Sequence, residues 1–179
     1  MACISKLASA IAYDCDTGAT GLVSAIIINK ADIASYVVES GTGTVSSFAL
    51  APGAKAYRIG TVKRSLVLSS TLKVNEGAPN AYSHSATMVY TGILDAAGRK
   101  NMAAFSNGSF VIMAKTNTLA APRIYGLYYG MSATSVEQNS HENGSWVTYT
   151  LETPENVIGE DAVAITAESY DTLYAAAVG

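Results

Sequence analysis

Hydrophobic and polar positions along the chain repeat mainly with the two-residue period of a β-strand. Short runs rich in Val, Ile, Thr and Tyr are separated by Gly, Pro and Asn, which end strands and form turns. Leu22–Asn29 is apolar enough for a buried strand, whereas Ser145–Glu152 alternates like a half-buried one. The expected strands are Leu22–Asn29, Ala34–Glu39, Thr44–Leu50, Lys55–Val62, Arg64–Val74, Ala81–Thr91, Ser109–Lys115, Arg123–Met131, Ser145–Glu152 and Ala162–Thr166.

Two of these runs predict a long hairpin. Arg64–Val74 and Ala81–Thr91 flank a loop that contains Gly77 and Pro79. In the returning strand one face is aromatic or apolar and the other is mostly Ser and Thr, which indicates a sheet that packs on one side only. The first face holds Tyr82, His84, Ala86, Met88 and Tyr90, and the second holds Ser83, Ser85, Thr87, Val89 and Thr91.

Helical periodicity is convincing in one segment, Ile93–Phe105, which Asn107-Gly108 would cap. The last residues, 167–179, carry only a weak pattern. The sequence therefore predicts a mainly β fold, an antiparallel β sandwich or barrel with one flanking α-helix. We expect an N-terminal arm over residues 1–21, the β domain over 22–166 and a C-terminal tail over 167–179.

Composition narrows the class of protein. Hydrophobic residues make up 49% of the 179 residues, charged residues 14%, and the mean hydropathy is +0.22. This excludes intrinsic disorder, and no apolar run approaches the ~18 residues of a membrane span. So much apolar surface indicates contact with other protein. The first residues make a poor secretory signal, so we expect synthesis in a reducing cytoplasm. Free thiols at Cys3 and Cys15 fit that compartment, and a Cys3–Cys15 disulfide is the alternative that the sequence leaves open.

Charge is distributed unevenly, although the net charge is only −3. Residues 1–123 carry 11 basic and 6 acidic side chains, whereas residues 124–179 carry 8 acidic and none that is basic. One interpretation is a solvated surface. The other is a subunit with a positive and a negative side, which would dock head-to-tail or line a pore.

Candidate catalytic and metal-binding residues do not form a recognisable site. His84 lies within a strand, so its neighbours Ser83 and Ser85 point to the opposite face, and His141 lies in a polar loop. Pairs of carboxylates fall in expected loops, and the Asp14 and Asp16 pattern is an incomplete calcium loop. We expect no enzyme activity, metal or cofactor. The carboxylate pairs are Glu152 with Glu155 and Glu160 with Asp161.

Aromatic residues leave a second function open. Exposed aromatic rings on a sheet can stack on sugars, although the same rings can fill a core or a subunit contact instead. A carbohydrate- or receptor-binding β module of a phage fibre or a cell surface is therefore the alternative. The rings concerned are Tyr125, Tyr128, Tyr129, Trp146 and Tyr149.

The order of several segments resembles a known family. A Cys-containing arm ends in a Gly-rich turn (AYDCDTGATG), and LVSAIIINKADI and the hairpin VESGTGTVSSFAL follow. The strand KVNEGAPNAYSHSATMVYTGIL precedes the helix, and FVIMAK, YGLYYGM and ENGSWVTYTLETPE complete the order. Over roughly residues 1–160, this order resembles the tail-tube and ring-type virion proteins of tailed bacteriophages, above all those of crAss-like and related gut phages.

The resemblance implies a virion structural protein of the phage tail that is made in the bacterial host cytoplasm. Its subunits would form homo-oligomeric rings, sixfold in tail tubes, which stack around a channel for DNA passage. Genomic DNA would be passing cargo, and other tail or portal proteins would be partners. Tail tubes and rings at the portal–tail junction share this fold, so both positions fit.

The resemblance also implies where subunits would meet. The hairpin Arg64–Thr91 would be the wall element and residues 74–81 its reaching tip, while the acidic residues of 124–179 would line the channel or meet the basic stretch 53–123. Positive charge at the hairpin departs from a negative lining, so the sign of the channel stays open. The expected subunit-interface residues are Lys63, Arg64, Lys73, Asn75, Glu76, Gly77, Pro79 and Asn80.

Overall fold

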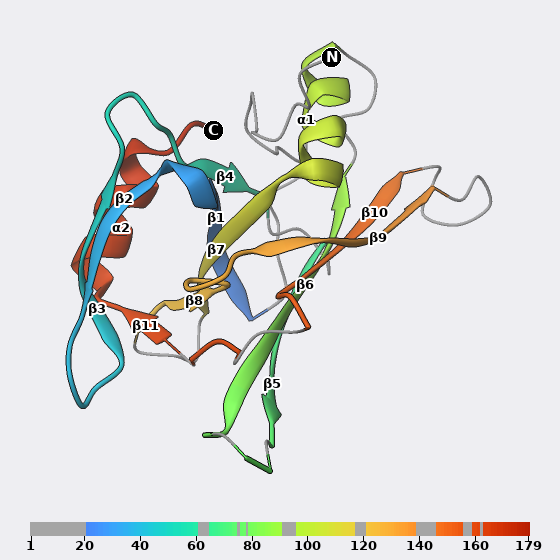
Figure 1. The fold of residues 1–179 in the computed structure, drawn as a ribbon. Coiled ribbons are helices and arrows are strands. Elements are labelled where there is room, and N and C mark those ends of the chain that lie inside the picture. The colour runs from blue at the N-terminus through green and yellow to red at the C-terminus, as the bar shows by residue number, and fades with distance from the viewer. Residues whose placement is uncertain are drawn as a thin grey trace.

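The computed structural model describes residues 21–60, 65–74, 76–77, 79–90, 96–116, 121–138, 146–155, 159–161 and 163–179. These residues form strands, two helices and a short 3-10 turn (Figure 1). The expected arm over residues 1–21 lies almost wholly outside the described part. The elements are β1 (Leu22–Asn29), η1 (Lys30–Asp32), β2 (Ile33–Val38), β3 (Thr44–Leu50), β4 (Tyr57–Ile59), β5 (Leu66–Lys73), β6 (Ala81–Tyr90), α1 (Ala96–Asn107), β7 (Ser109–Thr116), β8 (Arg123–Tyr125), β9 (Met131–Gln138), β10 (Val147–Glu152), β11 (Val163–Ile165) and α2 (Ala167–Ala176).

The antiparallel pair β1 and β7 forms the centre of the fold. Its register runs from Leu22 opposite Thr116 to Asn29 opposite Phe110. Residues 25–29 of β1 and 110–114 of β7 are all buried, so both faces of this pair are covered. Continuous apolar runs of this kind are what a strand buried on both faces requires.

The sheet divides at β7. Along one edge β7 pairs with β1, and along the other it pairs first with β9, through Ser109 and Phe110, and then with β8, from Ile112 to Ala114. One branch continues as β9-β10-β6-β5 and the other as β8-β11-β3-β2. Each branch packs on one face of the central pair, so the molecule has two cores.

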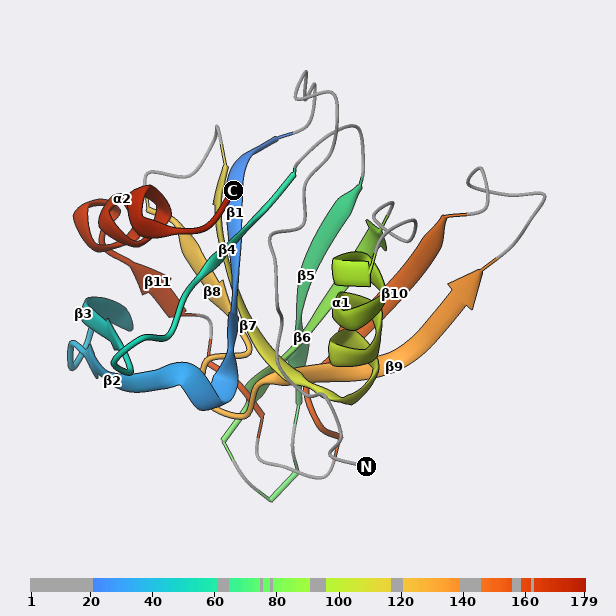
Figure 2. The same cartoon turned by 90° about the horizontal axis from the view of Figure 1, so that it is seen from above.

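The first core lies between the central pair, the β9-β10-β6-β5 branch and α1. Phe105 of α1 is completely buried there, and its ring centroid lies 5.0 Å from that of Tyr149, 5.5 Å from that of Phe110 and 5.8 Å from that of Tyr90. The second core lies on the other face, where Ile26, Ile28 and residues of β3, β8, β11 and α2 meet. Figure 2 shows α1 and α2 on opposite sides of the β1–β7 pair.

The expected fold class is confirmed only in part. The protein is mainly β, but the sheet is not closed, and it is mixed because β3 and β11 run parallel. The two branches leave β7 toward opposite faces, so their terminal strands do not pair with each other. Neither helix of the described residues is long and apolar enough to cross a membrane.

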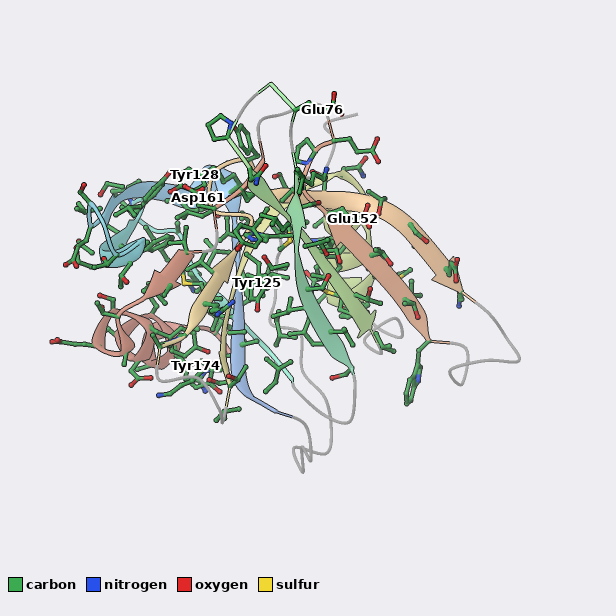
Figure 3. The ribbon with its side chains drawn as sticks, turned by 90° about the horizontal axis from the view of Figure 1, so that it is seen from below. Glu76, Tyr125, Tyr128, Glu152, Asp161 and Tyr174 are labelled. Atoms are coloured by element: carbon green, nitrogen blue, oxygen red, sulfur yellow. The ribbon has the colours of Figure 1, made fainter. Side chains whose placement is uncertain are left out.

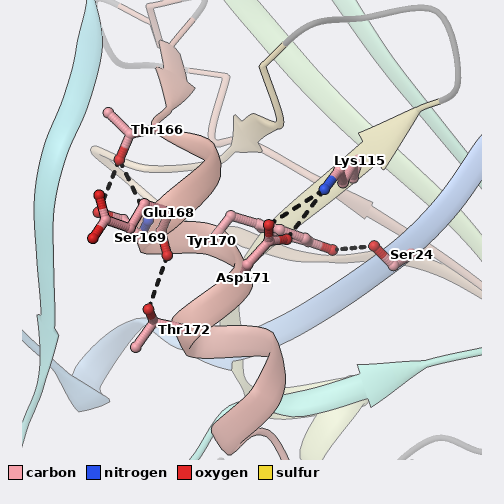
Figure 4. A network of polar contacts seen from close by, with 8 residues as sticks. All are labelled: Ser24, Lys115, Thr166, Glu168, Ser169, Tyr170, Asp171 and Thr172. Carbon is pink, nitrogen blue, oxygen red and sulfur yellow. Dashed lines mark hydrogen bonds and ion pairs between the residues drawn. The ribbon is translucent and has the colours of Figure 1, made fainter.

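The expectation of a single helix was wrong, because α2 occupies most of the segment predicted to be a weakly patterned tail. The Thr166 hydroxyl accepts a hydrogen bond from the Ser169 backbone N–H and begins the helix (Figure 4). Tyr170 is completely buried in the second core, and its hydroxyl lies 2.8 Å from that of Ser24. Tyr170, Leu173, Tyr174 and Ala177 do have helical spacing, which the sequence analysis missed.

The expected strand Arg123–Met131 is also wrong, since a loop at 126–130 divides β8 from β9. Gly126 and Gly130 both have φ of +75°, which suits glycine, and they reverse the chain there. A Cβ on Gly130 would lie 2.1 Å from the Ser109 hydroxyl oxygen. The close backbone approach that these glycines indicated is therefore present, but in a loop.

Replacing Gly130 with Ala should destabilise the fold strongly, because strain at positive φ and the clash with Ser109 act together. Gly53→Ala is the matched control: its φ is +79° and nothing lies within 4 Å of the added Cβ. We expect Gly53→Ala to lower the free energy of unfolding by about 1 kcal/mol and Gly130→Ala by clearly more. Urea titrations followed by circular dichroism would measure both, and equal losses would contradict the close packing.

Replacing Tyr170 with Ala should lower the free energy of unfolding by about 3 to 5 kcal/mol, because it empties part of the second core. Tyr170→Phe should cost about 1 kcal/mol, since it removes only the hydrogen bond to Ser24. The exposed Thr172→Ala on the same helix is the control. If Tyr170→Ala cost no more than Thr172→Ala, α2 would not belong to the core.

Candidate functional site

The β5–β6 hairpin, where subunit contacts were expected, projects from the body of the molecule (Figure 1). Its strands pair without interruption from Leu66 opposite Met88 to Lys73 opposite Ala81. This confirms the predicted hairpin. The regular ladder carries the connecting loop to the far end of the molecule.

The expected interface residues are only partly within the described structure. Lys73 ends β5 and is half-buried, whereas Glu76 and Gly77 are exposed in the loop. Figure 3 shows Glu76 at the outer end of the hairpin. Pro79 and Asn80 precede β6 and are also exposed. The other three expected residues, Lys63, Arg64 and Asn75, lie outside the described residues.

The two faces of the hairpin differ as predicted. In β6, His84, Ala86, Met88 and Tyr90 are buried toward the first core, while the intervening residues are only half-buried. On the outer face the Ser69 and Ser85 hydroxyl oxygens lie 2.8 Å apart.

The outer face of the hairpin continues across β10 and β9. Thr87 lies opposite Thr150, and Ser85 lies opposite Glu152. Because Phe105 of α1 packs on Tyr149, which points to the other side of β10, α1 covers only the core side of this branch. The outer face is therefore rich in Ser and Thr, with acidic groups at Glu137 and Glu152, and it also includes Val67 and Val89.

The free edge of β5 carries apolar side chains that the sequence analysis did not select. Among the described residues β5 pairs only with β6. Val67 is 52% exposed, Leu72 49% and Val74 75%. Leu72 shares a face with Leu66 and Leu68, which contribute to the first core, so the apolar face of the hairpin extends beyond the body. The sequence contains a signal for this extended apolar face. Leu72 and Val74 fall on the same face of a strand as Leu66 and Leu68, because even spacings separate them.

His84 is a buried structural residue. Its Nδ1 accepts a hydrogen bond from the Gly126 N–H at 2.9 Å, and its ring meets that of Tyr125 edge-on at 5.4 Å between centroids. Burial lowers the His84 pKa from 6.5 to about 4, so the ring is neutral near pH 7. This arrangement fastens β6 to the 126–130 loop.

Glu160 holds the same loop from another side. Its completely buried carboxylate accepts hydrogen bonds from the backbone N–H groups of Tyr128, at 2.8 Å, and Tyr129, at 2.6 Å. Burial raises the Glu160 pKa, whereas these donors and the positive charge of Lys30 oppose that rise. The Lys30 ammonium donates to the Leu127 carbonyl at 2.5 Å. Glu160 therefore holds the 126–130 loop in place through these hydrogen bonds.

The aromatic residues considered for sugar binding do not form one platform. Tyr149 is completely buried, Tyr125 packs against His84, and the Tyr128 ring lies edge-on to Tyr36 at 6.3 Å. The exposed members of the set are Trp146 and Tyr129.

The described residues offer little for binding a metal ion or a small molecule. They contain no group of three His, Cys, Asp or Glu side chains placed to hold a metal ion. A pocket beside η1 is lined by Asn29, Asp32 and Lys55, where the Asn29 amide donates to the Asp32 carboxylate at 2.8 Å. The remaining candidates, Cys3, Asp14, Cys15, Asp16 and His141, lie outside the described residues.

Comparison with known proteins identifies no relative. A scan against protein-family models, a search of curated proteins and a search of solved structures each gave no match.

His84 should make stability depend on pH between about 6.5 and 4. In that window the unfolded chain takes up a proton at His84 and the folded chain does not, so acidification destabilises the fold by up to about 3 kcal/mol. The stability is complete above pH 6.5 and is lost as the pH falls toward 4. His84→Asn can keep an acceptor near the Nδ1 position but does not titrate.

The measurement is the free energy of unfolding of both proteins between pH 7.5 and 4. The advantage of the wild type over His84→Asn should shrink as the pH falls, while the opposing contribution of Glu160, common to both, cancels in the difference. A difference that is constant with pH would show that His84 is not held neutral by burial.

Proposed function

We propose that the protein is a virion structural subunit that self-assembles into rings or a stacked tube in a phage tail, around a channel for DNA passage. The observation that carries this proposal is the projecting β5–β6 hairpin, whose apolar face runs on past the core to exposed Leu72 and Val74. The proposed role is structural, without catalysis or a cofactor.

Apolar exposure on the hairpin favours association. Fully burying a Val or Leu side chain stabilises by about 1.5 to 3 kcal/mol. The described part of the subunit leaves the Leu72 and Val74 side chains 49% and 75% exposed, so it does not supply this burial. Contact with a neighbouring subunit would supply it. The low content of charged residues, 14%, supports the same interpretation.

The polar outer face of the β9-β10-β6-β5 branch is our candidate for the channel wall. Hydroxyl groups of Ser and Thr offer no fixed positive charge, and Glu137 and Glu152 repel phosphate. Such a surface would let DNA pass without holding it. Lys73 lies on the same face of β5 as Ser69 and Thr71, near the tip, and is the basic side chain that the described residues of this branch place on that face.

Some charged side chains of the basic stretch 53–123 form contacts with residues of 124–179 within one subunit. Lys115 forms an ion pair with Asp171 at 3.2 Å (Figure 4). Arg58 donates from Nη2 to the Tyr174 carbonyl at 3.0 Å and lies over the Tyr174 ring. The charged side chains of the two regions that stay exposed would make docking between subunits depend on the salt concentration, because salt screens exposed charges.

Placement in the phage tail and the partners of the subunit belong to the same proposal. The protein would be made in the host cytoplasm and join other tail or portal proteins in the virion, with stacked, hexameric rings as the form expected for a tail tube. Support comes from the order of sequence segments and from the hairpin. Each core is sandwiched between the central pair and one branch, so rigid subunits could stack without distortion.

A carbohydrate- or receptor-binding β module is the second candidate. Trp146 is 48% exposed just before β10, and an exposed indole ring can stack on a sugar. Burial of Tyr149 and the half-buried state of Tyr125 weaken this alternative. Such a module would be monomeric or trimeric, so electron microscopy of the purified protein separates the two candidates.

Shortening residues 74–80 to Asn-Gly tests the hairpin tip. The ladder already closes at Lys73 opposite Ala81, and Asn-Gly forms a two-residue turn, so the subunit should fold and melt normally. Stacking of rings should be lost because the tip no longer reaches a neighbour. Circular dichroism and negative-stain electron microscopy would measure the two effects on the same sample.

A loop of equal length made of Gly and Ser is the control, since it keeps the reach and removes the side chains of Val74, Glu76 and Pro79. Normal tubes from the shortened protein would show that the tip is passive. A wild-type protein that stays monomeric at high concentration and in virions would contradict self-assembly itself.

A further inference from the structure

The two ends of the sheet offer complementary edges. Its strand order begins at β2 and finishes at β5, and within the described residues each of these strands pairs on one side only. Exposed edges are commonly protected by charge, by proline or by a β-bulge, and of these β2 has register shifts in its pairing with β3. β2 contains neither a charged residue nor a proline, and β5 contains only Lys73, at its end. Between its two register shifts β2 is regular, with Ser35 to Val37 opposite Ala49 to Ser47.

Both edges also expose apolar side chains. Val37 of β2 is 57% exposed, and Val67 and Leu72 of β5 are exposed to a similar degree. A backbone edge with adjacent apolar side chains is what pairing with another strand requires, because the backbone groups supply hydrogen bonds and the side chains are removed from water.

The charged residues at the ends of β2 and β5 and the directions of these two strands indicate how the edges would meet. Glu39 directly follows β2 and is exposed, and Lys73 ends β5. The β2–β3 turn and the β5–β6 loop lie at the same end of the molecule, the lower end in Figure 1, so β2 and β5 both run toward that end. Rotation about an axis along this direction preserves it. A copy placed beside the first by such a rotation would therefore bring β5 next to β2 in parallel.

We propose that β5 of one copy pairs in parallel with β2 of the next copy, with Lys73 beside Glu39. This register places Thr71 beside Val37 and Leu72 beside Val38. Thr71 and Val37 are exposed on the outer face, whereas Val38 packs against the second core, so outer side chains adjoin outer ones. The inference rests on the proposed self-assembly and names the contact that produces it.

The contact is heterologous, since two different edges meet. After one such contact, one copy still has its β2 edge free and the other its β5 edge, so further copies can add at both ends, and a rotation that closes gives a ring. A pairing of β5 with β5 would instead stop at a dimer and leave β2 unpaired. The two arrangements can be told apart by crosslinking.

Crosslinking tests the register. In a background with Cys3→Ser and Cys15→Ser, the double variant Val37→Cys with Thr71→Cys places two cysteines on neighbouring strands whose backbones lie ~4.8 Å apart, within the Cα–Cα range of a disulfide. Mild oxidation should give a ladder of covalent oligomers on a non-reducing gel, and a mixture of the two single variants should give dimers. Val37→Cys with Ser83→Cys is the control, because Ser83 lies one strand further in.

The outcomes separate the inference from the proposed function. If the double variant assembles, as sedimentation would show, but gives no ladder, the edge pairing is wrong and self-assembly stands. Dimers from Thr71→Cys alone would overturn the proposal in favour of β5 with β5. If wild-type protein does not assemble at all, both fall.

Charge reversal provides an independent readout. Lys73→Glu and Glu39→Lys should each raise the protein concentration needed for assembly several-fold, because like charges would then adjoin. The combination of both should restore it to within about twofold of the wild type. Additive losses in the double reversal would show that these two side chains do not meet.

Discussion

Burial of the β1–β7 pair on both faces is the constraint on which the rest of the structure depends. Ile26, Ile27 and Ile28 are fully shielded from water, as are the facing residues of β7, and each such side chain contributes about 1.5 to 3 kcal/mol. A pair with two apolar faces needs a cover on each. The division of the sheet at β7 supplies them, since one branch and one helix cover each face.

The division requires a tight reversal between β8 and β9, and polar groups hold it in place. Residues 126–130 receive contacts from His84 of β6, from Glu160 and from Lys30 of η1. These three side chains are far apart in the sequence, but they meet at this loop. Each of them is at least partly buried there. Their buried environment follows from their contacts with this loop, which connects the two branches beside the central pair.

The same division leaves the ends of the sheet unpaired, and this links fold to function. A closed barrel would have no edges, whereas this sheet ends in β2 and β5, both with apolar side chains in water. The hairpin presents β5 away from the body, and its outer face is polar. A subunit with a projecting edge and a smooth polar face is suited to assembly around a channel, which is the function proposed above.

The strands with strong patterns, the hairpin and its two unlike faces follow from the sequence alone, because alternation is a local property of the chain. The apolar run Leu22–Asn29 likewise indicated a buried strand, of which residues 25–29 are buried in the fold. Folding in three dimensions was needed to show that β7 has three partners, that Gly126 and Gly130 form a loop, and that Tyr170 lies in a core. These depend on which distant segments meet: a glycine permits a bulge or a reversal equally well, and a strand edge is free or covered only once every other strand has found its partner.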